Sequence, residues 1–150
     1  MTQPADAGVE PAAPDLFVLH HIGIVTSPQR YHDVVATLID GLRGTLEDEG
    51  GDDPLDINAT WIRVPSGLRL EVVCPRSDLD GPISRFLEKT GGGFHHVSFE
   101  TTAIGTCKAL TKAGGARIVG ECDDHGGWAE FFIDPEQTGG ALLHWMQALD

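Results

Sequence analysis

The sequence predicts an α+β protein in which two tandem βαβββ modules pair their curved sheets around a shared cleft. The main observation is an internal repeat. Leu19–Thr26 (LHHIGIVT) aligns without a gap with Phe94–Thr101 (FHHVSFET), at an offset of 96 − 21 = 75 residues in a chain of 150. A second match, between Leu68–Val73 and Ala141–Met146, indicates that both halves also end alike. Repeats indicate copies of one structural unit. Since a single copy leaves one sheet face uncovered, the two are expected to pack together.

The first module is expected over residues 15–79. A helix follows its first strand, because Ser27 and Pro28 are typical of a helix start and Gly44 of a helix end. The acidic, glycine-rich stretch 47–56 is expected to be a mobile loop. Alternating apolar residues and β-branched side chains predict strands at residues 16–26, 57–64 and 68–74.

The second module is expected over residues 94–150, after a connector helix and Gly-rich turn at residues 80–93. Its helix carries Ile104, Cys107 and Leu110 on one face. Its strands are expected near residues 94–101, 116–120, 128–134 and 140–147. Residues 1–14, rich in Ala, Pro and acids, are expected to form a disordered leader.

Composition excludes several classes of partner. The chain has 10 Lys and Arg against 23 Asp and Glu, a formal net charge of −13, which disfavours nucleic acid and anionic membranes. No apolar run approaches the length of about 20 residues that a membrane span needs. Three widely spaced cysteines and no signal peptide indicate reduced thiols and a cytoplasmic location.

Four residues at matched places in the two modules form a candidate metal site. His21 and His96 occupy equivalent points on the first strand of each half, and Glu71 and His144 equivalent points on the last. Three imidazoles and one carboxylate suit one divalent ion of Co, Ni, Zn, Mn or Fe better than Ca or Mg. A lone histidine is more often a core or surface residue, but internal symmetry matches all four positions here. Glu71 also lies in an apolar run, where a carboxylate is costly unless it is paired or bound to metal.

The residues resemble the vicinal oxygen chelate (glyoxalase/bleomycin-resistance/dioxygenase) superfamily, and within it the methylmalonyl-CoA epimerase branch. The resemblance implies paired βαβββ modules, one divalent metal and commonly a homodimer. It also implies that the metal ligands are His21, Glu71, His96 and His144. The matching segments are Leu19–Val25, Leu70–Pro75, Phe86–Glu100, His125-Gly126 and Phe132–Gln147.

The chain departs from the epimerase pattern in its ligands and in its base. Glu71 stands where the epimerases carry Gln and His144 where they carry Glu, so one carboxylate remains in the ligand set. The glutamate that the epimerases are thought to use as a base falls at or beside Thr60, and a threonine accepts no proton near neutral pH. Thr60 lies five residues before Pro65, and the residue five places before the equivalent Pro135 is Glu130. Glu130 is therefore the candidate base, with a metal-bound hydroxide, or a merely solvated Glu130, as the alternatives.

Three further histidines are weighed. His125 matches a loop near the substrate in the family, and an ordinary loop histidine is an equal alternative. His20 and His95 adjoin the predicted ligands, so on regular strands they would point to the opposite sheet face as structural or supporting residues.

The leading hypothesis is a metal-dependent epimerase, isomerase or lyase that acts on a small carbonyl compound, which could be an acyl-CoA, through an enolate. Removing a proton beside a carbonyl needs both a base and charge stabilisation. One alternative is an Fe(II) oxygenase, because three of the four ligands would form a triad of two His and one carboxylate. Another is a non-catalytic binding protein of the antibiotic-resistance kind.

Overall fold

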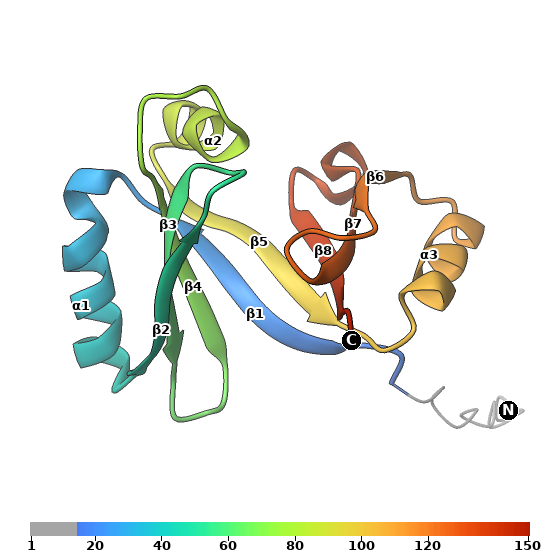
Figure 1. The fold of residues 1–150 in the computed structure, drawn as a ribbon, viewed down its shortest axis with the longest axis horizontal. Helices are drawn as coiled ribbons and strands as arrows, with labels where there is room; N and C mark the ends of the chain where they lie inside the picture. The colour runs from blue at the N-terminus through green and yellow to red at the C-terminus, as the bar shows by residue number, and fades with distance from the viewer. Residues whose placement is uncertain (1–14) are drawn as a thin grey trace, which may run out of the picture.

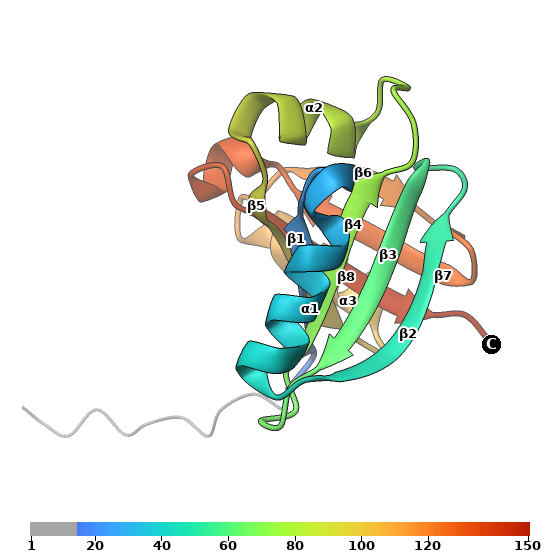
Figure 2. The same cartoon turned by 90° about the vertical axis from the view of Figure 1, so that its left-hand side faces the viewer.

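Eight strands form one sheet in the order β2-β3-β4-β1-β5-β8-β7-β6 in the computed structural model, which describes residues 15–150 (Figures 1 and 2). The strands are β1 (Val18–Val25), β2 (Thr45–Asp52), β3 (Ile57–Arg63), β4 (Arg69–Pro75), β5 (Gly93–Glu100), β6 (Ile118–Cys122), β7 (Trp128–Ile133) and β8 (Leu142–Ala148). The helices are α1 (Tyr31–Leu42), α2 (Pro82–Thr90) and α3 (Ile104–Ala113), with 3-10 turns at Pro28–Arg30 and Pro135–Thr138.

The two modules meet at β1 and β5. These strands pair antiparallel in the middle of the sheet, and each also pairs parallel with the last strand of its own module, β1 with β4 and β5 with β8. Figure 1 shows α1 and α3 on opposite outer flanks, with the sheet curving between them. The predicted fold class of two βαβββ units sharing a curved sheet is therefore confirmed.

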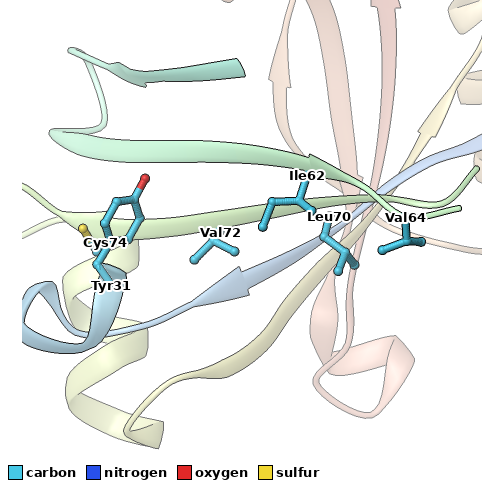
Figure 3. Close-up of a cluster of buried hydrophobic side chains, with 6 residues drawn as sticks. All are labelled: Tyr31, Ile62, Val64, Leu70, Val72 and Cys74. Atoms are coloured by element: carbon cyan, nitrogen blue, oxygen red, sulfur yellow. The ribbon is translucent and has the colours of Figure 1, made fainter. Parts of the chain in front are cut away.

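The core lies between the sheet and its flanking helices. In the first module the buried cluster comprises Tyr31, Ile62, Val64, Leu70, Val72 and Cys74 (Figure 3). Apolar side chains of α1 pack against it, which removes the apolar stripe of that helix from water. In the second module Cys107 of α3 packs with Phe131 and Trp145, whose rings stack 5.2 Å apart. In each half of the sheet, the face toward α1 or α3 is thus buried. The opposite face, called the inner face, carries the candidate site.

Helix α2 covers one end of the first half-sheet. Ile83 packs with Val25, Ala59 and Val73, which come from β1, β3 and β4. The helix ends at Gly91, whose φ of 77° closes it in the left-handed conformation. The predicted connector helix therefore also closes one end of the inner face.

The acidic segment is a strand rather than the expected mobile loop. Thr45–Asp52 forms β2, which pairs antiparallel with β3 along its whole length. As an edge strand it keeps nearly all its side chains in water, so its carboxylates need no burial. Arg63 and Arg69 pair with Glu47, which further offsets the acidic charge. Because its residues do not alternate between apolar and polar, the sequence pattern does not predict this strand.

The helix start and stop of the first module also differ in detail. Ser27 precedes a 3-10 turn and its side chain makes no capping bond, and α1 begins only at Tyr31. The left-handed residue at the end of α1 is Arg43, with φ 54°, rather than Gly44. Gly44 donates to the carbonyl of Ile39 and so still closes the helix.

Among residues 15–150, no helix is long and apolar enough to cross a membrane. The predicted leader, residues 1–14, lies outside the described residues.

Candidate metal centre

The sheet register places the four predicted ligands at equivalent points. Glu71 on β4 pairs with Gly23, two residues after His21. His144 on β8 pairs with Ser98, two residues after His96. All four therefore belong to the inner layer of the central strands β1, β5, β4 and β8, as their matched places in the sequence predict.

Three of the four side chains converge. Ligand atoms of His21, Glu71 and His96 all lie within 4.8 Å of one another. Nε2 of His21 lies 2.9 Å from Nε2 of His96. Oε2 of Glu71 lies 3.5 Å from the first nitrogen and 3.3 Å from the second. Two imidazoles and a carboxylate from three strands thus face one common point.

Burial keeps this cluster suited to a cation. Burial, with His96, His20 and His144 nearby, lowers the pKa of His21 to about 2, so its imidazole is neutral near neutral pH. The side chains of His96 and Glu71 are only 13% and 14% exposed. Trp61 on β3 packs edge-on against His21, with ring centroids 4.7 Å apart. Neutral imidazoles are required of metal ligands, and a nearly buried carboxylate gains most from a cation.

The donor set fits a divalent transition metal. Two imidazole nitrogens and one carboxylate oxygen could coordinate a single ion such as Zn, Fe, Co, Ni or Mn, whereas Ca and Mg prefer ligands that are all oxygen. His21, Glu71 and His96 are the residues that would hold it.

The fourth predicted ligand, His144, lies beside this cluster and is engaged elsewhere. Its ring centroid is 6.2 Å from that of His96. Its Nδ1 lies 2.7 Å from Oγ of Ser98, and its Nε2 lies 2.8 Å from Oε2 of Glu130. Phe132 stacks on its ring at 4.4 Å. The role of His144 as a metal ligand therefore stays a prediction, because its Nε2 would first have to lose the contact with Glu130.

A chain of polar contacts extends from His144 on β8 to Asp52 on β2. Oε1 of Glu130 lies 3.2 Å from Nδ1 of His125, and Nε2 of His125 lies 2.6 Å from Oδ2 of Asp52. Asp52 ends β2 and His125 lies between β6 and β7, so this contact joins elements from opposite edges of the sheet. The hydrogen bond to Asp52, helped by the charge of Glu130, raises the pKa of His125 against the opposing effect of burial. Glu130 and His125, both predicted from sequence, are thus brought together.

Thr60 has a different environment. Its hydroxyl bonds that of Tyr31, and both side chains are buried on the face of the sheet that α1 covers. In the sheet register, Trp61 pairs with Glu71 and Phe132 pairs with His144. The first-module counterpart of Glu130, two residues before Phe132, is therefore Ala59 rather than Thr60.

His20 and His95 do not point to the opposite face. Each is the extra residue of a β-bulge, since the β1–β5 register shifts between Leu19 and His21 and again between Gly23 and Ile24. Nδ1 of His20 lies 2.7 Å from Nδ1 of His21, and Nδ1 of His95 lies 2.9 Å from Nδ1 of His96. The expectation from strict alternation is wrong because a bulge re-aims side chains.

Sequence reasoning missed three residues of this site. Gly23 leaves the space that the His96 ring fills, since a Cβ there would lie 2.1 Å from Cε1 of that ring. Ser98, its counterpart in the repeat, bonds His144. Asp52 holds His125. Gly23 and Ser98 could have been predicted, because a small residue follows each candidate ligand histidine by two places. Asp52 could not, because nothing distinguishes it from the other acidic residues of its segment.

Comparisons with known proteins show the fold. No family model matches the chain, and no curated protein matches it by sequence. Methylmalonyl-CoA epimerase from Mycobacterium tuberculosis superposes with a TM-score of 0.78 at 22% identity, covering 92% of this chain and 93% of that one. A hypothetical protein from Bacillus halodurans gives 0.78 at 20% identity, covering 89% and 96%. A Streptomyces coelicolor methylmalonyl-CoA epimerase variant in complex with 2-nitronate-propionyl-CoA gives 0.74 at 18% identity, covering 91% and 100%.

We expect Gly23→Ala to weaken binding of Co(II) by at least about tenfold, in the range that displaced ligands produce. The added methyl group would occupy the position of the His96 ring, so that ring must move. Co(II) titration followed by absorption measures the effect. Gly41→Ala on α1 is the matched control, because a Cβ there meets nothing within 4 Å. Equal Co(II) affinity of Gly23→Ala and wild type would contradict the geometry.

We expect Asp52→Asn to destabilise the protein below about pH 6 and to have a smaller effect above about pH 8. The folded pKa of His125 is raised, so its stabilisation is present below the ordinary histidine pKa and is lost as pH rises through the raised value. Urea unfolding at both pH values measures the difference. Asp48→Asn, on the same strand and exposed, is the control. A destabilisation that does not change with pH would show that Asp52 does not act through His125.

Proposed function

We propose that this protein is a divalent-metal-dependent epimerase, isomerase or lyase that acts on a small carbonyl compound through an enolate. The observation that carries the proposal is the convergence of His21, Glu71 and His96 in an epimerase-like fold, with the neighbouring His144 bonded to the carboxylate of Glu130. We further propose that the chain is a divergent member of the vicinal oxygen chelate superfamily, near its methylmalonyl-CoA epimerase branch. The motifs of the two His-His strands support this assignment.

The proposed roles follow from the positions of the side chains. A cation held by His21, Glu71 and His96 would polarise the substrate carbonyl and offset the negative charge of the enolate. Glu130, 15% exposed, borders the inner face next to His144 and is the group placed to take the α-proton. His125 holds the other oxygen of the Glu130 carboxylate, and Asp52 holds His125. A base that is fixed in this way loses little freedom when it meets the substrate.

The outer strands β3 and β7, which are equivalent in the two modules, carry different side chains at matching positions. Glu130 on β7 has Ala59 as its counterpart on β3, so the first module supplies no carboxylate at the equivalent point. Inversion of a carbon centre needs proton removal on one face and return on the other, whereas an isomerase or lyase can work from one side. The replaced epimerase base therefore favours the isomerase and lyase forms of the proposal. A small acyl-CoA stays within the substrate class, since neighbours of this fold include an acyl-CoA complex.

An Fe(II) oxygenase is the second candidate, and a specific observation favours it. The three convergent side chains are two histidines and one carboxylate, the ligand set of the facial triad. Because His144 is bonded to Glu130, it would not crowd a cation held by these three side chains. Assembly as a homodimer and a cytoplasmic location stay predictions from the sequence.

Metal analysis of the purified protein tests both enzyme proposals. We expect about one divalent ion per chain in wild type and loss of that ion in the His21→Ala, His96→Ala double variant, because two of the three convergent ligands are removed. His32→Ala, an exposed histidine on α1, is expected to keep the metal. Wild-type protein without metal after equilibration with each candidate ion would refute both. Bound iron with substrate-dependent oxygen uptake would select the oxygenase.

Proton exchange tests the enolate mechanism. Wild-type protein in D₂O, incubated with acyl-CoA thioesters and small 2-oxo acids, is expected to exchange an α-proton of its substrate, observed by proton NMR. Glu130→Gln should lower that rate by about 10²–10⁴-fold, the usual contribution of a positioned base. Glu136→Gln, an exposed acid that pairs with Arg117, is the control. Exchange at the wild-type rate in Glu130→Gln would exclude this residue as the base.

A further inference from the structure

The two strands that carry the candidate ligands contain equivalent irregularities. In the β1–β5 ladder, Leu19 pairs with Phe99 and His21 with Ser98, so His20 is an extra residue of β1. At the other end of the ladder, Gly23 pairs with His96 and Ile24 with Phe94, so His95 is an extra residue of β5. The offset of 75 residues that relates His21 to His96 also relates these two extra residues. The bulge is therefore part of the repeated unit and comes immediately before each ligand.

Each bulge places one imidazole against the next. Nδ1 of His20 and Nδ1 of His21 are 2.7 Å apart, and the two rings meet edge-on at 5.0 Å. Nδ1 of His95 and Nδ1 of His96 are 2.9 Å apart, again edge-on, at 5.1 Å. In both pairs the ligand histidine thus has its Nδ1 engaged by the preceding residue. Its Nε2 is the nitrogen that faces the shared cluster, where His21 and His96 approach to 2.9 Å.

The two bulge histidines are themselves held in place. Nη1 of Arg69 donates to Nε2 of His20 at 2.6 Å, and Arg69 is fixed in turn by Glu47. The ring of His95 packs edge-on against Phe86 of α2, with centroids 4.7 Å apart. Because Nε2 of His20 accepts from Arg69, the proton of the His20 ring lies on Nδ1 and faces Nδ1 of His21, which would leave the proton of His21 on Nε2. Within residues 15–150, Nε2 of His95 has no such donor, so Nδ1 of His95 can accept from Nδ1–H of His96.

We propose that His95 is a positioning residue of the metal centre: its Nδ1 accepts from Nδ1–H of His96, so that the unprotonated Nε2 of His96 points to the ion. This inference rests on the metal site of the proposed function. A histidine ligand binds metal through one nitrogen, and the hydrogen bond at the other nitrogen fixes the orientation of the ring. The partner is usually a carboxylate, a backbone carbonyl or water. Here an imidazole that enters through a β-bulge takes that place in the second module.

Co(II) affinity, measured by competition with a chromophoric chelator, tests the proposal on the protein itself without a substrate. His95→Ala should bind Co(II) about 10–100-fold more weakly than wild type, the usual effect of losing such a partner. The visible absorption bands of bound Co(II) should also change, because the His96 ring is free to turn. His95→Asn should recover most of the affinity, since the Asn amide oxygen can accept from His96 in place of Nδ1. His32→Ala is the matched control, as His32 is exposed on α1.

The outcomes separate this inference from the proposed function. If wild type and His32→Ala bind no Co(II), the metal site itself fails and the positioning role fails with it. If wild type binds Co(II) and His95→Ala binds it equally well with unchanged absorption bands, only the positioning role is overturned. A His95→Asn variant as weak as His95→Ala would also overturn it, because the Nδ1 contact would then not be the cause. Urea unfolding of every variant without metal identifies any that fails to fold. If His95→Ala is one of these, His95→Asn provides the decisive comparison.

Discussion

The antiparallel pairing of β1 with β5 is the constraint on which the rest of the structure depends. It brings the two copies of the repeat side by side in opposite directions, so each ligand histidine lies opposite the residue two places beyond the other one: His21 opposite Ser98, and His96 opposite Gly23. Those positions must be small, because the facing ring occupies the space above them. A Cβ on Gly23 would overlap the ring of His96. The ladder thus fixes both the distance between the two imidazoles and the residue types that the repeat can tolerate around them.

Much of this arrangement could be predicted from the sequence because it follows from the repeat and from strand periodicity. The 75-residue offset matched His21 with His96, and the matched ends of the modules paired Glu71 with His144. Parallel pairing of β1 with β4 and of β5 with β8 then places all four in one layer. The candidate base Glu130 was found by the same counting, and the contact between Glu130 and His144 agrees with a place on the inner face.

The remaining features depend on interactions that leave no periodic signal. An edge strand can keep its side chains in water, so the acidic residues of β2 show no apolar alternation and their sequence predicts a loop. A bulge adds one residue without altering composition, so strict alternation misplaced His20 and His95. The pairing of His144 with Glu130, and of His125 with Asp52, depends on how far the sheet curves. The sheet register makes Ala59, the residue beside Thr60, the counterpart of Glu130, whereas Thr60 itself is bonded to Tyr31 under α1.

The central strands of the site are alike in the two modules, and the outer strands are not. The central strands repeat each other closely: a bulge histidine, a candidate ligand histidine and a small residue recur in both copies, so each module would supply one imidazole to a shared cation. The outer strands do not repeat. β7 carries Glu130 where β3 carries Ala59, and the second module adds His125 against Asp52 of the first. In the proposed function, Glu130 would take a proton from one side of the substrate, whereas identical outer strands would offer a base on both sides. The difference between β3 and β7, with the central strands kept alike, therefore fits one-sided proton transfer better than inversion of a carbon centre.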